Sequence, residues 1–169
     1  MNVFGVVGWK NSGKTGLMER LVSEISARGF SVSTIKHAHH TFDVDQPGKD
    51  SFRHRQAGAQ EVLLASAKRW SLMAELRDAP EPSLTELLAR MSPVDLVLVE
   101  GYKRDAHPKI EAHRAATGQD LLAGSDPTIR AVASDSDPSD LSCPVFDLDA
   151  TVKIADFILA QLALDTKGT

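Results

Sequence analysis

The chain has 169 residues, 42% of them apolar, which is enough for one hydrophobic core. Its formal net charge of −4 argues against a surface that attracts nucleic acid or anionic membrane as a whole, and its single cysteine, Cys143, excludes an internal disulfide or a cysteine-based metal site within one chain. We therefore expect one domain over residues 1–164, a frayed tail over residues 165–169, no targeting segment, a cytoplasmic location, and neither nucleic acid nor a membrane as a partner.

A strand, a helix and a second strand open the chain. Residues 3–7 are a nearly continuous apolar run, the pattern of a central parallel strand buried on both faces. Apolar residues then recur at helical spacing from Gly16 until Arg28 and Gly29, where a basic last turn and a glycine end the helix. Residues 31–35 predict the second strand. Such a unit places the first loop at the carboxyl edge of a parallel sheet, where ligands bind.

That first loop, residues 8–15, reads G-x-x-x-x-G-K-T, the pattern of a phosphate-binding loop. Its glycines permit a tight turn in which main-chain N–H groups point at phosphate oxygens. Lys14 supplies an ammonium that neutralises charge developing on the β and γ phosphates, and Thr15 supplies a hydroxyl for Mg²⁺. The residues predicted to bind a nucleotide here are Gly8, Asn11, Ser12, Gly13, Lys14, Thr15 and Gly16.

A polar loop rich in ionisable groups follows the second strand, from residue 37 to residue 48. It is too long for an ordinary connection, so we expect a working loop. Its His-x-His-His run, formed by His37, His39 and His40, either binds a transition metal or faces solvent and phosphates. Asp50 either completes the Mg²⁺ shell and orients water, or caps a short helix that runs towards Gln56.

Two apolar segments, residues 61–65 and 69–76, flank a Ser-Ala-Lys turn and predict an antiparallel hairpin. Trp70 and Leu72 share one face of the second segment. A hairpin of this kind lies at or beyond a sheet edge, which makes it a candidate dimer surface. Further on, Ser83 and Glu86 form a capping box that starts a helix ending near Met91.

The second half of the chain continues the α/β pattern. Residues 96–99 predict a third buried strand, residues 129–133 a weaker fourth and residues 145–146 a short last one, before a helix over residues 151–164. The predicted fold is therefore an α/β P-loop NTPase three-layer sandwich, with a mostly parallel sheet and an added antiparallel hairpin.

Polar residues follow these later strands. Glu100 ends the third strand, where its carboxylate either holds Mg²⁺ or merely begins a turn. Ser134 and Asp135 follow the fourth strand, and a carboxylate there would accept hydrogen bonds from guanine N1–H and N2–H, which adenine lacks. Asp135 is otherwise a turn residue. A further set either receives a second phosphorylated ligand or forms a solvated surface: Tyr102, Lys103, Arg104, His107, Lys109, His113 and Arg114.

These motifs together resemble the molybdopterin-guanine dinucleotide biosynthesis protein B (MobB) family. The matching segments are residues 8–15, Lys36-His37-Ala38-His39-His40, Phe42-Asp43-Val44-Asp45, Pro47-Gly48-Lys49-Asp50-Ser51, Ala57-Gly58-Ala59 and Leu98-Val99-Glu100-Gly101-Tyr102-Lys103. The resemblance implies a dimeric, Mg²⁺-dependent GTP-binding protein with weak GTPase activity. It also implies assistance to MobA, the guanylyltransferase that joins GMP to molybdopterin.

By position, the resemblance gives Gly13, Lys14 and Thr15 to phosphates and Mg²⁺, and Glu100 to the acidic strand end. It makes Asp135 the guanine reader, and Lys103, in the Glu-Gly-x-Lys motif, is a candidate ligand residue. Trp9 stands where some related GTPases carry a signature lysine, so a lysine that crosses a dimer from that position is not supported.

The leading hypothesis is thus a slow GTPase that acts in molybdenum cofactor assembly, with GTP and Mg²⁺ as its ligands. Slow turnover is expected because no arginine is evidently committed to the γ-phosphate, although Arg53 or a partner could supply one. Two alternatives stay open. One is a metallochaperone GTPase that uses the histidine loop, and the other is a binding module for molybdopterin or its nucleotide, in which hydrolysis is incidental.

Overall fold

The computed structural model describes residues 1–38, 42–139 and 141–164. Their contacts form two compact units: Met1–His37 with Met91–Thr169, and Ala38–Arg90. The first unit carries the sheet and the predicted phosphate-binding loop, residues 8–15, and the second carries the hairpin, so each is described by itself. The single domain expected over residues 1–164 stays a prediction, and the tail expected over residues 165–169 lies outside the described residues.

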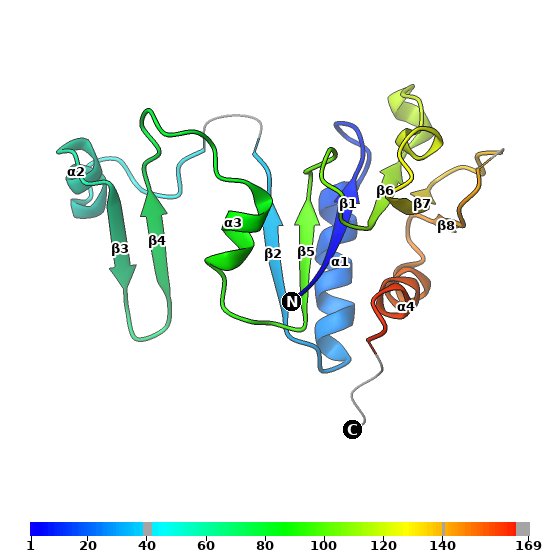
Figure 1. Ribbon diagram of the computed structural model, residues 1–169, viewed down its shortest axis with the longest axis horizontal. Helices are drawn as coiled ribbons and strands as arrows, with labels where there is room; N and C mark the ends of the chain where they lie inside the picture. Colours follow the sequence, from blue (N-terminus) through cyan, green and yellow to red (C-terminus); the bar gives the residue numbers. More distant parts are fainter. Residues whose placement is uncertain (39–41, 140, 165–169) are drawn as a thin grey trace. The chain divides into compact units, whose positions relative to one another are not determined.

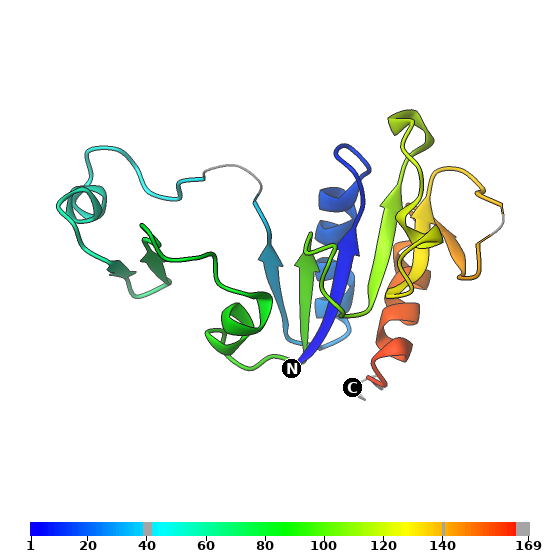
Figure 2. The same cartoon turned by 45° about the horizontal axis from the view of Figure 1, so that its top comes forward.

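The first unit is built on a parallel sheet, whose strands stand side by side in Figure 1 and, tilted, in Figure 2. The strand order is β2-β5-β1-β6-β7-β8, and every neighbouring pair is parallel. All carboxyl ends therefore share one edge, as the sequence pattern predicted. The strands are β1 (Asn2–Val7), β2 (Val32–Lys36), β5 (Leu96–Glu100), β6 (Lys109–His113), β7 (Ile129–Ser134) and β8 (Val145–Asp147).

Two helices, α1 (Lys14–Ala27) and α4 (Thr151–Gln161), pack on one face of this sheet. Their apolar stripes, which include Leu21 and Ile158, meet strand residues such as Phe4 and Leu98, and all four side chains are fully buried. Each such side chain contributes about 1.5–3 kcal/mol by leaving water. Both helices were expected; α1 begins two residues earlier than Gly16, and α4 ends before residue 164. No helix in the described parts of the chain is long and apolar enough to cross a bilayer.

Strand β6 is the one element of the sheet that the sequence pattern did not reveal. It reads KIEAH and is buried along its whole length. Lys109 and His113 had been assigned to a basic segment that either receives a second phosphorylated ligand or forms a solvated surface. That assignment is wrong, because both are buried strand residues whose side chains are engaged inside the unit.

The charged residues of β6 are satisfied by the loops that cover the second face of the sheet. The Lys109 ammonium donates to the Asp105 carbonyl and the Thr128 hydroxyl, and lies 3.6 Å from the Asp126 carboxylate. The Glu111 carboxylate accepts main-chain N–H bonds of 3.0 and 2.8 Å at the start of a short 3₁₀ helix, Leu122–Gly124. Buried charges need such partners, so these loops are structural rather than free surface.

The second unit contains α2 (Asp50–Gln56), the antiparallel hairpin of β3 (Glu61–Ala65) and β4 (Trp70–Ala74), and α3 (Leu84–Ala89). The hairpin confirms its prediction. Arg55 of α2 joins this unit together, with ion pairs of 2.8, 3.3 and 2.7 Å to Asp43, Asp45 and Glu75. The predicted capping box at the start of α3 is present. Helix α2 begins at Asp50, and its N-cap is Lys49, so Asp50 is not the capping residue.

A half-buried histidine, His107, lies beside Lys109 and is expected to make the stability of the first unit depend on pH. Both ring nitrogens of His107 are buried without a hydrogen-bond partner in the described residues. The ring lies against the backbone of Gly5, where an added Cβ would stand 2.5 Å from Nε2. Burial lowers the pKa of His107, and the neighbouring Lys109 charge lowers that pKa further.

We expect the free energy of unfolding to fall as the pH is lowered from about 7 to about 5. Below the ordinary histidine pKa of about 6.5 the unfolded chain takes up a proton that folded His107 resists, and the loss continues until the folded pKa is reached. Urea denaturation at several pH values measures the slope. His107→Gln should flatten this slope, and His54→Gln, at an exposed histidine of α2, should not. Equal slopes for the wild type and His107→Gln would contradict the assignment.

Candidate functional site

The loop between β1 and α1 has the backbone of an anion cradle. Gly8, Asn11 and Gly13 have φ angles of 143°, 64° and 95°, and Gly13 is the left-handed residue at which α1 begins. Glycine adopts such angles without strain, and asparagine does so more readily than most other residues. Alternation of right-handed and left-handed residues turns successive N–H groups towards one concavity, and the helix adds its positive end. The sequence motif therefore has the local geometry that it predicted.

Two of these glycines are also required by close contacts. A Cβ on Gly8 would lie 2.3 Å from the main-chain oxygen of Ala112 in β6, a separation that atoms do not tolerate. A Cβ on Gly13 would lie 3.0 Å from Leu148, just after β8, and 3.2 Å from Nε of Arg114. Residues at the ends of β6 and β8 thus lie in direct contact with the loop.

Lys14 lies with its ammonium inside the loop. Its Nζ donates to the main-chain oxygen of Trp9 at 2.6 Å. Burial lowers the pKa of Lys14, and the Glu100 carboxylate opposes that shift. A hollow of about 340 Å³ opens beside it, lined by Asn11, Ser12, Gly13, Lys14, Thr15, Gly16 and Arg114. Six of these seven residues are members of the predicted nucleotide site; Arg114 had been placed only in the basic segment.

Thr15, in the first turn of α1, meets Glu100 at the carboxyl end of β5. Thr15 Oγ1 and Glu100 Oε1 are 3.5 Å apart, and Lys36 Nζ, at the end of β2, is 3.2 Å from the same carboxylate oxygen. Glu100 is largely buried. The hydroxyl and the carboxylate are hard oxygen donors of the kind Mg²⁺ prefers, so this pair fits the ion that the sequence motif implies.

Ser134 and Asp135 stand at the end of β7, at the same edge of the sheet. The Ser134 hydroxyl is 3.0 Å from Nδ1 of His113 and is buried. Asp135 accepts a 2.9 Å bond from the main-chain N–H of Ala115, the first residue of a 3₁₀ helix, Ala115–Thr117. Asp135 therefore fixes the chain just after β6. The roles of both residues in reading guanine stay predictions.

Lys103 contacts the phosphate-binding loop through an aromatic ring. Its Nζ lies 4.1 Å from the centre of the Trp9 ring, a cation–π geometry, and Trp9 Nε1 donates to the Asp120 carbonyl at 2.8 Å. Burial lowers the pKa of Lys103, and Glu111 opposes the shift. Trp9 therefore joins the outer side of the loop to the 103–120 segment, a role that the sequence motif did not indicate.

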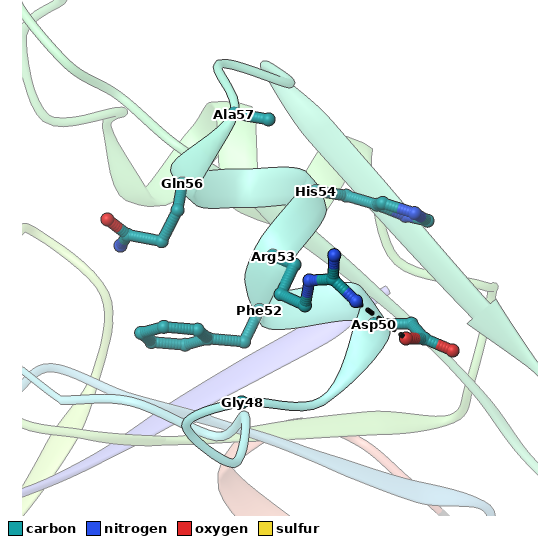
Figure 3. A pocket seen from close by; sticks show the side chains of 7 residues that line it. All are labelled: Gly48, Asp50, Phe52, Arg53, His54, Gln56 and Ala57. Carbon is teal, nitrogen blue, oxygen red and sulfur yellow. Dashed lines mark ion pairs between the residues drawn. The ribbon is translucent and has the colours of Figure 1, made fainter.

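Asp50 lies in the second unit, at the first residue of α2 (Figure 3). Its carboxylate is 3.9 Å from the Arg53 guanidinium. Asp50 and His54 extend to one side of α2, whereas Phe52 and Gln56 extend to the other. These residues, with Gly48, Arg53 and Ala57, line an open hollow of about 720 Å³. The roles of Asp50 as a metal ligand and as a catalytic residue stay predictions.

The histidine run is only partly described. The His37 ring stacks against Tyr102 at 4.8 Å between ring centres, and its main-chain N–H donates to the Glu100 carbonyl at 2.9 Å. His39 and His40 lie outside the described residues. Elsewhere in residues 1–38, 42–139 and 141–164, no three His, Cys, Asp or Glu side chains are grouped to hold a metal ion.

A family model and curated sequence relatives all match this chain to one protein family. Residues 3–135 match the family model described as molybdopterin guanine dinucleotide synthesis protein B. A protein of Haemophilus influenzae named molybdopterin-guanine dinucleotide biosynthesis adapter protein is 40% identical, over 92% of this chain and 86% of its own length. A protein of the same name from Escherichia coli is 41% identical, over 89% and 87% of the two chains.

Solved structures agree with these sequence relatives. The MobB protein homolog of Bacillus stearothermophilus has 31% sequence identity and a TM-score of 0.71, and the match covers 98% of this chain and 100% of that chain. MobB of Bacillus subtilis has 26% identity and a TM-score of 0.73, with 96% and 98% covered. The predicted fold class is confirmed.

We expect Gly8→Ala to destabilise the protein by more than about 2 kcal/mol, because the new methyl group collides with a main-chain oxygen of β6 and the backbone angle is unfavourable as well. Gly118→Ala is the matched control. Gly118 also has a positive φ, 62°, but an added Cβ meets nothing within 4 Å, so only a backbone cost of about 1 kcal/mol is expected. Urea denaturation measures both. Equal losses would show that contact with β6 is not what restricts residue 8.

Proposed function

The chain belongs to the molybdopterin guanine dinucleotide synthesis protein B family, and we propose that it is a GTP-binding adapter in molybdopterin-guanine dinucleotide biosynthesis that hydrolyses GTP slowly with Mg²⁺. One observation carries the proposal: the left-handed loop residues, the Lys14 ammonium and the start of α1 converge on one hollow. This arrangement suits a polyphosphate, because main-chain N–H groups and a positive helix end favour anionic oxygens.

Nucleotide binding would replace a hydrogen bond that the loop makes within itself. Lys14 donates to Trp9, and that bond would be exchanged for charge-assisted bonds to the β and γ phosphates. Thr15 and Glu100 would hold Mg²⁺, which supplies charge neutralisation at the phosphates when bound. The Lys36 ammonium, 3.2 Å from Glu100, would orient this carboxylate. The exposed Asp50 carboxylate is proposed to complete the metal shell or to orient water.

Hydrolysis on such a site depends on positioning and on charge. The chain's residues would hold the phosphates, exclude a part of the solvent and neutralise developing charge with Lys14, and no covalent intermediate on the protein is needed. Slow turnover is consistent with an adapter, since a bound nucleotide then persists while a partner acts. We propose the guanylyltransferase MobA as that partner, a cytoplasmic location, and guanine selection by Ser134 and Asp135 at the end of β7.

Lys14→Ala should weaken Mg²⁺-dependent GTP binding about tenfold to hundredfold, because hydrogen bonds to a charged group contribute about 1.5–3 kcal/mol. Isothermal titration calorimetry with GTP, GDP and ATP measures the change. Lys10→Ala is the matched control: it removes an exposed lysine of the same loop that does not line the phosphate hollow.

Unchanged GTP affinity in Lys14→Ala, or an equal loss in Lys10→Ala, would contradict the site assignment. The same titrations test base choice. Equal wild-type affinities for GTP and ATP would remove Asp135 from the site and leave a phosphate-binding protein without guanine selection.

We also propose that the chain forms a homodimer through the β3–β4 hairpin. Leu63 faces Leu72 across the hairpin, and Ala65 faces Trp70, so these side chains share one face. Leu63, Trp70 and Leu72 are 60%, 66% and 44% exposed. Large apolar side chains gathered on a two-stranded sheet are expected to be covered, and a second copy of the same face covers them by symmetry.

Leu72→Lys should shift the protein from dimer to monomer, because a charge would be buried at the centre of the apolar face. Size-exclusion chromatography with light scattering measures the mass. Lys68→Glu, in the exposed turn of the same hairpin, is the control and should leave the mass unchanged. A wild-type monomer, or a Leu72→Lys dimer, would contradict this assembly.

A further inference from the structure

We infer that Arg114 is a nucleotide-binding residue of this protein, whose guanidinium contacts the α and β phosphates on the side of the loop away from Glu100. The inference rests on the proposed nucleotide site and adds to it a cation that the sequence motif does not contain. Four observations carry it: the register of β6, the approach to Gly13, the absence of a competing partner, and the position of β6 in the sheet.

The register of β6 carries Arg114 to the level of the loop. Val7, the last residue of β1, pairs with Glu111, so the end of β6 runs beside the loop rather than beside the strand. Gly8 packs directly beneath the Ala112 carbonyl. Arg114 is the next residue after β6, and its backbone is extended, with φ −131° and ψ 127°. The side chain therefore starts at the edge of the sheet where the loop lies.

The guanidinium then lies on the loop itself. Its Nε and Nη2 atoms are 3.2 and 3.6 Å from the point where a Cβ on Gly13 would be. Arg114 lines the phosphate hollow and, among the residues that the structure describes, is the only lining residue from outside the loop and the first turn of α1. The Ser12 hydroxyl, in the same lining, is buried without a hydrogen-bond partner in the described residues. The lining of the hollow thus includes a hydroxyl group that is available to hydrogen-bond a ligand.

Arg114 has no competing partner in the described parts of the chain: no hydrogen bond or ion pair involves its guanidinium. Two arginines, one in α1 and one at its C-cap, are by contrast engaged. Arg20 binds the Leu148 carbonyl, Thr151 and Asp149, and Arg28 binds Glu24 and Asp156. Only the backbone of Arg114 is fixed, by the Ala115–Asp135 bond and by Thr117 Oγ1 on its carbonyl at 2.8 Å. An anchored backbone with a free guanidinium is suited to bidentate recognition of phosphate.

The sheet order decides which phosphates Arg114 meets. Strand β1 lies between β5 and β6, so Glu100 and Arg114 flank the loop from opposite sides. Thr15 and Glu100 mark the proposed metal side, where the γ-phosphate belongs. Arg114 is on the other side, beside Gly13, and so reaches the α and β phosphates. It therefore binds GDP and GTP alike and differs from an arginine that stabilises the γ-phosphate during hydrolysis.

Arg114→Gln should weaken GDP and GTP binding by the same factor, about tenfold to hundredfold, with kcat at saturating GTP changed less than about twofold. Arg114→Lys should recover part of the affinity, since the charge stays but the bidentate geometry is lost. Arg130→Gln, at an exposed arginine of β7, is the control for net charge and should bind as the wild type does. Calorimetry with each nucleotide and a phosphate-release assay provide these measurements, and urea denaturation confirms that the variants fold.

Unchanged affinities in Arg114→Gln would overturn the inference. The proposed function would still stand in that case, provided that the wild-type protein binds GTP. A loss confined to GTP, together with a fall in kcat, would move Arg114 to the γ-phosphate and overturn the assignment to the α and β phosphates. If the wild type bound neither nucleotide, the proposed function itself would fail, and this inference with it.

Discussion

The close approach of β6 to the loop between β1 and α1, the predicted phosphate-binding loop, is the constraint on which the rest of the first unit depends. The Ala112 carbonyl occupies the space in which any side chain at residue 8 would lie. This contact restricts the register of β6 against β1. The register in turn determines where Arg114 and Ala115 leave the sheet. Asp135 then fixes Ala115 from the end of β7. One steric contact between backbones thereby aligns three strand ends around a single loop.

The sequence predicted the loop, both large helices and the flanking strands because each of these has a local signature. Glycine positions indicate the loop, and continuous apolar runs indicate β1 and β5. Apolar residues that recur with the helical period of about 3.6 residues indicate α1 and α4. Strand β6 has no such signature. Lys109, Glu111 and His113 alternate with two apolar residues, a pattern that indicates an exposed strand or surface coil. Their charges are buried only because loops distant in sequence supply Asp126 and the amides at residues 122 and 123.

The same distinction applies to the candidate site. Lys14, Thr15 and Glu100 were predicted because each occupies a fixed place in a motif or at a strand end. Arg114 was seen only as one charge in a basic segment, since its neighbourhood depends on the missed strand. Trp9 was noted as a departure from a signature lysine, but its contacts with Lys103 and the Asp120 carbonyl are tertiary and have no local pattern. Residues placed by motif are thus readable from sequence, whereas residues placed by sheet register are not.

Local charge, rather than the net charge of −4, governs what the loop attracts. Lys14, Lys36 and Arg114 surround it at the ends of three structural elements, and Glu100 is the carboxylate set among them. Charges beyond about 10 Å are screened at ordinary ionic strength, so acidic residues elsewhere on the surface oppose this cluster weakly. Lys36 and Arg114 also differ in kind: Lys36 is committed to Glu100, while Arg114 has its donors available. A polyphosphate entering the loop would therefore displace no ion pair on the β6 side, and its binding there would not compete with the Glu100 carboxylate that is proposed to hold Mg²⁺.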